Sequence, residues 1–241
     1  MAWQCIVGGL IMFVGFIGVL VAAKKHMEPA AMGCAGVMIA GLVIYMIYYL
    51  NPPPNLDYQV YGKAVAAKVG TAVKSSGAQK VLWVTGDLSS EYSKMCFEAF
   101  KQAYGSNVEA VSMSDGENMG GIMELTPQKL KEILKSATPD DAVVLDVSMM
   151  MPSKQIEFFK SSYKGPKVFL TNNATPMGST PKAINTALTK GGLKALVISL
   201  DKIDEEFKPD SDELDEAFSK RYVLVDAGNF DNYKERFSMG I

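Results

Sequence analysis

The first fifty residues contain two long runs without a charged side chain, and these runs constrain the fold more than any other feature. Residues 3–23 and residues 30–50 each extend over 21 residues with no Asp, Glu, Lys or Arg. A helix rises about 1.5 Å per residue, so each run measures about 31 Å as a helix, close to the hydrocarbon thickness of a bilayer. The segment between them, residues 24–29, is only long enough for a tight turn. The sequence therefore predicts an N-terminal two-helix transmembrane hairpin over residues 1–50.

The basic residues near the two runs predict the orientation of this hairpin. Lys24 and Lys25 lie between the runs, whereas residues 1–4 have no basic side chain and the next one after the second run is Lys63. Short loops that carry Lys and Arg stay on the cytoplasmic side of a membrane. A secretory signal peptide would instead carry its positive charge before the apolar run. We therefore predict a multi-pass protein of the cell (inner) membrane, with a cytoplasmic hairpin loop and a periplasmic or extracellular C-terminal domain.

Residues 51–56 predict a stiff linker, because three consecutive prolines lack N–H groups and favour the polyproline II conformation. The remaining residues, 57–241, suffice for one domain with its own core. Of the 24 basic and 26 acidic side chains, 22 and 25 lie beyond residue 50, which leaves a net charge of 22 − 25 = −3 there. A weakly acidic balance of this kind excludes nucleic acid as a partner. The one histidine, His26, precedes the domain, which excludes catalysis by an imidazole base within it.

Short apolar runs alternate with amphipathic patterns through residues 57–241. The runs are hydrophobic at consecutive positions, as in Val143–Leu145, which is typical of parallel strands covered on both faces. Thr126-Pro127 and Thr180-Pro181 each place a capping hydroxyl before a proline and predict two helix starts. Strict alternation predicts a doubly wound, mainly parallel-sheet, three-layer α/β domain. The predicted strands are Lys80–Thr85, Val108–Ser112, Ala142–Val147, Lys167–Thr171, Lys194–Ser199 and Tyr222–Asp226, and a predicted helix over Tyr58–Val73 precedes them.

Polar residues that follow the predicted strands form the candidate site, because ligands of such domains bind at the carboxyl ends of the strands. Neither a dinucleotide-binding glycine fingerprint nor a phosphate-binding P-loop is present, so we predict no cofactor and assign no catalytic residue. An alternative is that these residues only form turns and cap helices. The candidate ligand-binding residues are Thr85, Gly86, Asp87, Ser89, Asp115, Ser148, Asn172, Asn173, Asp201 and Asp226.

Carboxylates recur at or near the predicted strand ends, at Asp87, Asp115, Asp146, Asp201 and Asp226. Carboxylate oxygens that gather in one place bind Mg²⁺ or Ca²⁺, or act as an acid/base pair. These five come from different strands, and the sequence does not determine the order of the strands. We therefore predict no metal site.

The segment Val81–Asp87, followed by an amphipathic helix and by Asn107–Val111, resembles the opening of one lobe of the type I periplasmic solute-binding proteins. Proteins of that family clamp a solute between two lobes, whereas this chain has enough residues for one lobe. The resemblance therefore implies a small polar ligand, and a complete clamp only where two copies of the chain pair.

The segment Val143–Pro152 resembles the phospho-acceptor strand of response-regulator receiver domains, with Thr171 at the position of that family's hydroxyl. This resemblance implies that Asp146 is the acceptor. Asp87 stands alone where the receiver domains have an acidic pair, and Ser199 ends the strand where they have a lysine. We interpret the likeness as a shared flavodoxin-like fold rather than shared chemistry.

These patterns together predict a membrane-anchored accessory protein whose exocytoplasmic α/β domain recognises another protein or a small polar ligand. The expected partners are the lipid bilayer, a membrane protein or a second copy of the chain, and a small polar ligand. Two alternatives stay open. One is a carboxylate-dependent enzyme that acts on a small substrate, and the other is a purely structural subunit of a larger membrane complex.

Overall fold

The computed structural model of the protein describes residues 3–24, 28–50, 58–113, 124–174, 176, 179–200, 207–210 and 212–237. The chain divides into two compact units, Met1–Leu56 and Asp57–Ile241. The predicted linker over residues 51–56 lies outside the described residues.

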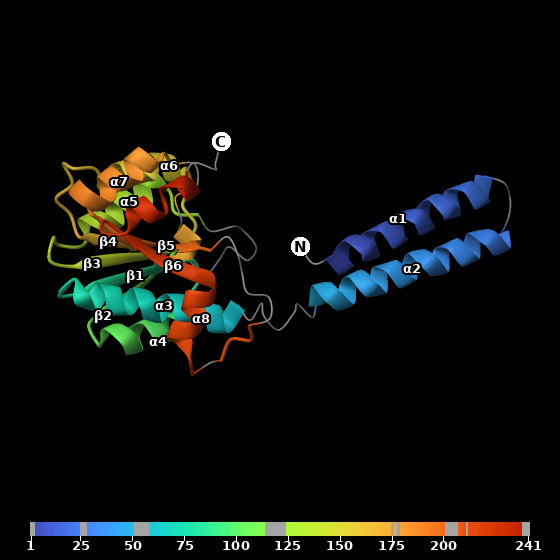
Figure 1. The fold of residues 1–241 in the computed structure, drawn as a ribbon, viewed down its shortest axis with the longest axis horizontal. Coiled ribbons are helices and arrows are strands. Elements are labelled where there is room, and N and C mark those ends of the chain that lie inside the picture. The colour runs from blue at the N-terminus through green and yellow to red at the C-terminus, as the bar shows by residue number, and fades with distance from the viewer. Residues whose placement is uncertain are drawn as a thin grey trace. The chain divides into compact units, whose positions relative to one another are not determined.

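The N-terminal unit is a hairpin of two helices, α1 (Trp3–Lys24) and α2 (Glu28–Leu50) (Figure 1). The two helices approach closely at the glycines of α1. A Cβ atom on Gly15 would lie 2.7 Å from the backbone nitrogen of Met38, and one on Gly18 would lie 2.5 Å from Cys34 Sγ. Both predicted helices are therefore present and pack against each other through small residues.

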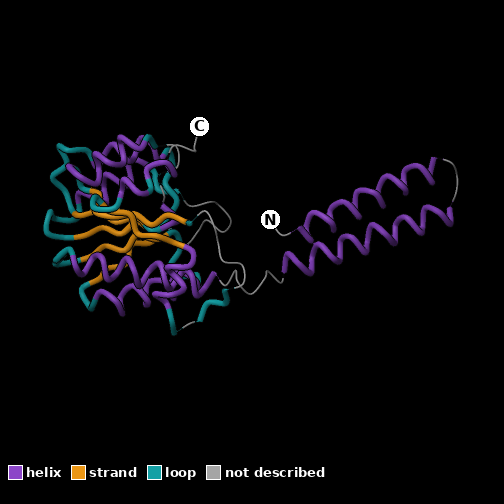
Figure 2. The backbone as a smooth tube through the Cα atoms, viewed as in Figure 1, coloured by secondary structure: helices purple, strands orange, loops and turns teal. Residues whose placement is uncertain are grey.

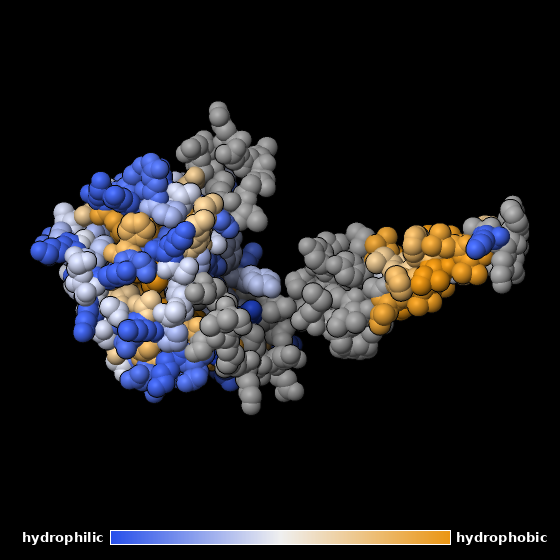
Figure 3. All heavy atoms as spheres, turned by 90° about the horizontal axis from the view of Figure 1, so that it is seen from above, coloured by the Kyte–Doolittle hydropathy of each residue, from blue (hydrophilic) through white to orange (hydrophobic). Residues whose placement is uncertain are grey.

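Large apolar side chains lie on the outside of this hairpin (Figure 3). The membrane-spanning character predicted for the two runs is not supported by the structure, since none of the helices that it describes is long and apolar enough to cross a membrane. The exposed apolar side chains of the hairpin are Leu10, Phe13, Val14, Phe16, Ile17, Leu20, Val21, Met32, Val37, Ile39, Leu42 and Val43.

The C-terminal unit is built on a six-stranded sheet with the order β2-β1-β3-β4-β5-β6 (Figure 2). The strands β1 to β5 are parallel to one another, and β6 runs antiparallel to β5. The prediction of an α/β fold with a mainly parallel sheet is confirmed. The strands are β1 (Val81–Thr85), β2 (Val108–Ser112), β3 (Ala142–Asp146), β4 (Lys167–Leu170), β5 (Leu193–Ser199) and β6 (Tyr222–Asp226).

Helices cover both faces of the sheet, with α3, α4 and α8 on one face and α5, α6 and α7 on the other (Figure 1). The hydroxyls of Thr126 and Thr180 accept hydrogen bonds from the backbone N–H groups of Lys129 and Ala183, both at 3.2 Å, so the two predicted helix caps are present. The helices are α3 (Tyr58–Ser75), α4 (Glu91–Tyr104), α5 (Pro127–Lys135), α6 (Pro152–Gln155), α7 (Pro181–Lys190) and α8 (Leu214–Arg221), with short 3-10 helices at Ile156–Phe159, Asn172–Ala174, Phe230–Asn232 and Lys234–Phe237.

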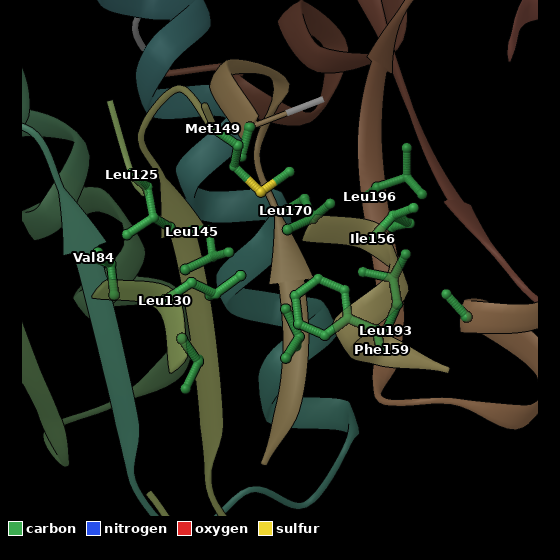
Figure 4. Packing of buried hydrophobic residues seen from close by; sticks show 14 of the residues in the cluster. Val84, Leu125, Leu130, Leu145, Met149, Ile156, Phe159, Leu170, Leu193 and Leu196 are labelled. Atoms are coloured by element: carbon green, nitrogen blue, oxygen red, sulfur yellow. The ribbon is translucent and has the colours of Figure 1, made fainter. Parts of the chain in front are cut away.

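Alternate residues of each strand point to opposite faces of the sheet and build two separate cores. Val84, Leu145 and Leu170 pack on the face covered by α5, α6 and α7, together with leucine, isoleucine and phenylalanine side chains from these helices and their neighbours (Figure 4). On the opposite face, the Trp83 ring lies 4.7 Å from the Phe100 ring, measured between centroids. Burial on both faces explains why the strands are hydrophobic at consecutive positions.

The direction of β6 departs from a simple alternation of parallel strands and helices. Ser199 pairs with Tyr222 and Ala195 pairs with Asp226, so β6 begins beside the carboxyl end of β5. Helix α8 ends at Arg221, directly before β6, and thus delivers the chain to the edge where β5 ends. A parallel strand needs a crossover that returns the chain to the opposite edge. Because α8 makes no such return, β6 is antiparallel.

Candidate functional site

The edge at which β1 to β5 end is called here the carboxyl edge, and it carries a polar row of Ser112, Thr85, Asp146 and Thr171. In the sheet register, Thr85 of β1 lies between Ser112 of β2 and Asp146 of β3, and Thr171 follows β4, the next strand. Trp83, two residues before Thr85, packs in the core beneath α3 and α4, so the row points to this same face. The row crosses the boundary between β1 and β3, where the strand order reverses and where ligands of such folds bind.

Asp146 is the centre of the polar row. Its Oδ1 atom accepts hydrogen bonds from the Thr171 hydroxyl at 2.7 Å and from the Asn173 side-chain amide at 3.0 Å. Burial raises the pKa of Asp146 to about 6, against the opposing effect of these two hydrogen bonds. Both donors are uncharged, so the carboxylate is held in place without being neutralised.

Helix α4 brings two protonated groups to the same region. Burial raises the pKa of the Cys96 thiol to about 12, and the charge of Asp146 adds to this increase. The pKa of the Tyr92 hydroxyl is also raised, mainly by burial and then by the neighbouring Cys96 and Asp146. Gly62 of α3 leaves space for Tyr92, because a Cβ atom at that position would overlap the tyrosine hydroxyl. The two groups keep their protons at neutral pH and are hydrogen-bond donors rather than nucleophiles.

Several predicted site residues lie at the carboxyl edge in different roles. Thr85 belongs to the polar row, and Asn173 binds Asp146. The carbonyl of Gly86 accepts a hydrogen bond from the Ser112 hydroxyl at 3.4 Å. The side-chain amide of Asn172 donates to Asn173 Oδ1 at 3.4 Å, so Asn172 is one step removed from the carboxylate.

The carboxylate of Asp87 closes its own loop. It accepts hydrogen bonds from the backbone N–H and the hydroxyl of Ser89, both at 2.7 Å, and these bonds lower the pKa of Asp87. The backbone carbonyl of Ser148 accepts from the Leu125 N–H at 2.8 Å, which ties the loop after β3 to the segment before α5. At Asp87 and Ser89 the structure thus favours the turn interpretation over the ligand-binding one.

Asp226 was wrongly predicted to lie at the carboxyl edge. Because β6 is antiparallel, its last residue pairs with Ala195 near the beginning of β5, at the opposite edge of the sheet. Its Oδ1 atom accepts hydrogen bonds from the backbone N–H groups of Gly228 and Asn229 and closes a turn. Asp115 and Asp201 lie outside the described residues.

Five members of this site were not among the predicted binding residues: Ser112, Asp146, Thr171, Tyr92 and Cys96. Asp146 was noted only as one of several carboxylates and as the acceptor implied by a resemblance. A signal for the row does exist in the sequence. Thr85, Asp146 and Thr171 each lie two residues after a buried core residue of a strand. Side chains two residues apart in a strand point to the same face of the sheet, so all three lie on one face. The positions of Tyr92 and Cys96 depend on how α4 packs, which the strands alone do not reveal.

Two surface grooves lie away from the polar row. They hold about 550 and 410 Å³, are lined by residues of α3, α4 and α8 and the segments beside them, and share Leu214. Within the described parts of the chain, no three His, Cys, Asp or Glu side chains gather as metal ligands would.

No family model and no curated protein matches this chain. Among solved structures, it is similar to a carbohydrate transporter from Acidothermus cellulolyticus 11B in complex with myo-inositol, with a TM-score of 0.45 and 12% identity over 74% of this chain and 62% of that one. It is also similar to a galactofuranose binding protein, with a TM-score of 0.42 and 14% identity over 77% and 64% of the two chains. A third similar structure is a carbohydrate transporter solute binding protein from Agrobacterium radiobacter in complex with D-arabinose. Its TM-score is 0.40 and its identity is 16%, over 74% of this chain and 63% of that one.

The chain therefore spans less than two thirds of the length of these proteins. The expected weak resemblance to periplasmic solute-binding proteins is present, and it concerns the fold alone.

Proposed function

We propose that residues 57–241 form a recognition domain that binds a small polar ligand at the carboxyl edge, around Asp146. One observation carries this proposal. At the point where the strand order reverses, Thr171 and Asn173 hold Oδ1 of a half-buried carboxylate, and no hydrogen bond from a described residue reaches its Oδ2. A carboxylate fixed through one oxygen leaves the other to accept a hydrogen bond from a ligand.

Binding is better supported than the alternative of a carboxylate-dependent enzyme. An acid/base mechanism requires a second group that exchanges protons near the operating pH. The charge of Asp146 acts on two titratable groups of α4, Tyr92 and Cys96, and the pKa values of both are raised further above neutrality. Both keep their protons at neutral pH, so neither acts as a general base there.

We further propose that the α1–α2 hairpin anchors this domain to the cell (inner) membrane. The proposal is supported by the large apolar side chains on the outside of the hairpin, such as Phe13, Val14 and Met32, whose exposed fractions are 61%, 63% and 78%. Extended exposed apolar surfaces mark contacts with lipid or with other proteins. With Lys24 and Lys25 in a cytoplasmic loop, the domain lies on the periplasmic or extracellular side.

Native mass spectrometry of the full-length protein, gently extracted from its own membrane, tests the binding proposal. We expect a reproducible small added mass that is lost in Asp146→Asn and Thr171→Val. The matched control is Asp215→Asn, which removes a charge on α8 and should keep the added mass. A protein that carries no small molecule and copurifies with membrane proteins in a fixed ratio would instead identify a structural subunit.

A fusion experiment tests the orientation. A reporter enzyme that is active only in the reducing, ATP-containing compartment is joined to the C-terminus of the full chain. We expect no reporter activity in intact cells and normal activity from a reporter without the hairpin. An active fusion would contradict the proposed location of the domain.

A further inference from the structure

We propose that the ligand of the Asp146 site carries a positively charged amino group, and that this group pairs with Asp146 Oδ2. The inference rests on the proposed function and names the chemical class of its ligand.

The hydrogen bonds of Asp146 are unevenly distributed between its two oxygens. Both donors, the Thr171 hydroxyl and the Asn173 amide, reach Oδ1, at 2.7 and 3.0 Å. Thr171 is itself fully buried, and its N–H donates to the Leu145 carbonyl at 3.1 Å, so the position of its hydroxyl is set by the sheet. A rigid donor on one oxygen orients the whole carboxylate, and since no residue in the described ranges donates to Oδ2, we assign this oxygen to a donor of the ligand.

The charge of this carboxylate is not neutralised by a cation of the described residues. The ion pairs that these residues form are Lys68–Asp215, Lys80–Glu109, Lys101–Glu98 and Lys160–Glu157, none of which includes Asp146.

The elements packed around the site supply few opposing charges. From α3, Lys63 lowers the pKa of Cys96, and from α4, Lys94 lowers the pKa of Asp87. Neither lysine contributes to the pKa of Asp146, which only Thr171 and Asn173 lower. The polar row adds hydroxyls and no positive charge.

These conditions favour a cationic ligand over a neutral or anionic one. A half-buried carboxylate that no cation of the described residues pairs with is unfavourable, and a cation with hydrogen-bond donors offsets that cost. A neutral hydroxyl satisfies Oδ2 but leaves the charge in place, and an anion is repelled. Charge-assisted hydrogen bonds are about twice as strong as neutral ones, so an ammonium group gains most from this oxygen.

Three probes with the same carbon chain and different charge test the proposal: putrescine, butanediol and succinate. Binding of each to the full-length protein in detergent is measured by calorimetry at neutral pH. We expect putrescine to bind at least about tenfold more tightly than the other two, which corresponds to one charge-assisted contact. Asp146→Asn, which keeps the shape and an acceptor oxygen, should remove this preference, and Asp215→Asn should keep it.

The outcomes separate this inference from the proposed function. Equal binding of the three probes, tighter binding of butanediol or succinate, or a putrescine preference that survives in Asp146→Asn would overturn the inference. If butanediol binds best and Thr171→Val abolishes its binding, the carboxyl edge is still a ligand site and only its assignment to amines fails. If native mass spectrometry also detects no small molecule, the proposed function fails as well.

Discussion

At the scale of single residues, Asp146 makes the stability of the domain depend on pH. Its pKa is about 6 in the folded protein, against an ordinary value of 3.8, so the folded state binds this proton more tightly than the unfolded state. Protonation of Asp146 therefore stabilises the folded state. This stabilisation is complete below about pH 4 and is lost as the pH rises through 6. Two pKa units correspond to a loss of up to about 3 kcal/mol.

We expect Asp146→Asn to remove most of this pH dependence and to be more stable than the wild type at pH 7. Denaturant unfolding of both proteins at several values between pH 4 and pH 7 measures the effect. Asp215→Asn, whose side chain is 87% exposed, serves as the control and should follow the wild-type curve. If the free energies of unfolding of the wild type and Asp146→Asn change with pH in the same way, burial does not shift the pKa of this carboxyl group.

At the scale of the elements, two of the helix starts depend on a side-chain cap and a third does not. Thr126 and Thr180 accept hydrogen bonds from the third residue of their helices, whereas Ser90, the cap residue of α4, makes no such bond. We expect Thr126→Ala and Thr180→Ala each to lower the free energy of unfolding by about 1 kcal/mol. Ser90→Ala is the matched control. Its free energy of unfolding should lie within a few tenths of a kcal/mol of the wild-type value. A loss at Ser90 as large as at the two threonines would contradict the assignment of the caps.

The same two caps show what local sequence determines. A threonine followed by proline encodes the start of a helix within a few residues, so Thr126 and Thr180 were predictable without knowledge of the fold. The direction of β6 was not, because it depends on where α8 returns the chain. Asp226 ends an apolar strand just as Asp146 does, yet the two residues lie at opposite edges of the sheet.

At the scale of the whole molecule, the two units of the chain are held together internally by different means. The sheet domain has two apolar cores, whereas the hairpin depends on the close approach of Gly15 and Gly18 to α2. A Cβ atom on Gly18 would lie 3.1 Å from the Cβ atom of Cys34, closer than the about 3.5–4.5 Å found in disulfides, so a small separation of the two helices brings the two positions into disulfide range. We therefore expect Gly18→Cys to form a disulfide with Cys34 under mild oxidation.

Counting free thiols with a maleimide reagent, in a Cys5→Ser background, measures this crosslink. Gly36→Cys is the control, because no atom lies within 4 Å of a Cβ atom at that position, and its thiol should stay free. Crosslinking at Gly36 but not at Gly18 would mean that α1 contacts a different face of α2.

The helical hairpin, the approximate bounds of the strands along the chain and the caps of two helices could all be predicted from the sequence. Each of these follows from residues that are neighbours in the chain: an uncharged run, a continuous apolar strand, a threonine before a proline. The order of the strands within the sheet, the antiparallel direction of β6 and the contact of Asp146 with Thr171 and Asn173 could not be predicted in this way. These features depend on packing between residues far apart in the sequence, where many arrangements satisfy the same local pattern and only the packed core selects one.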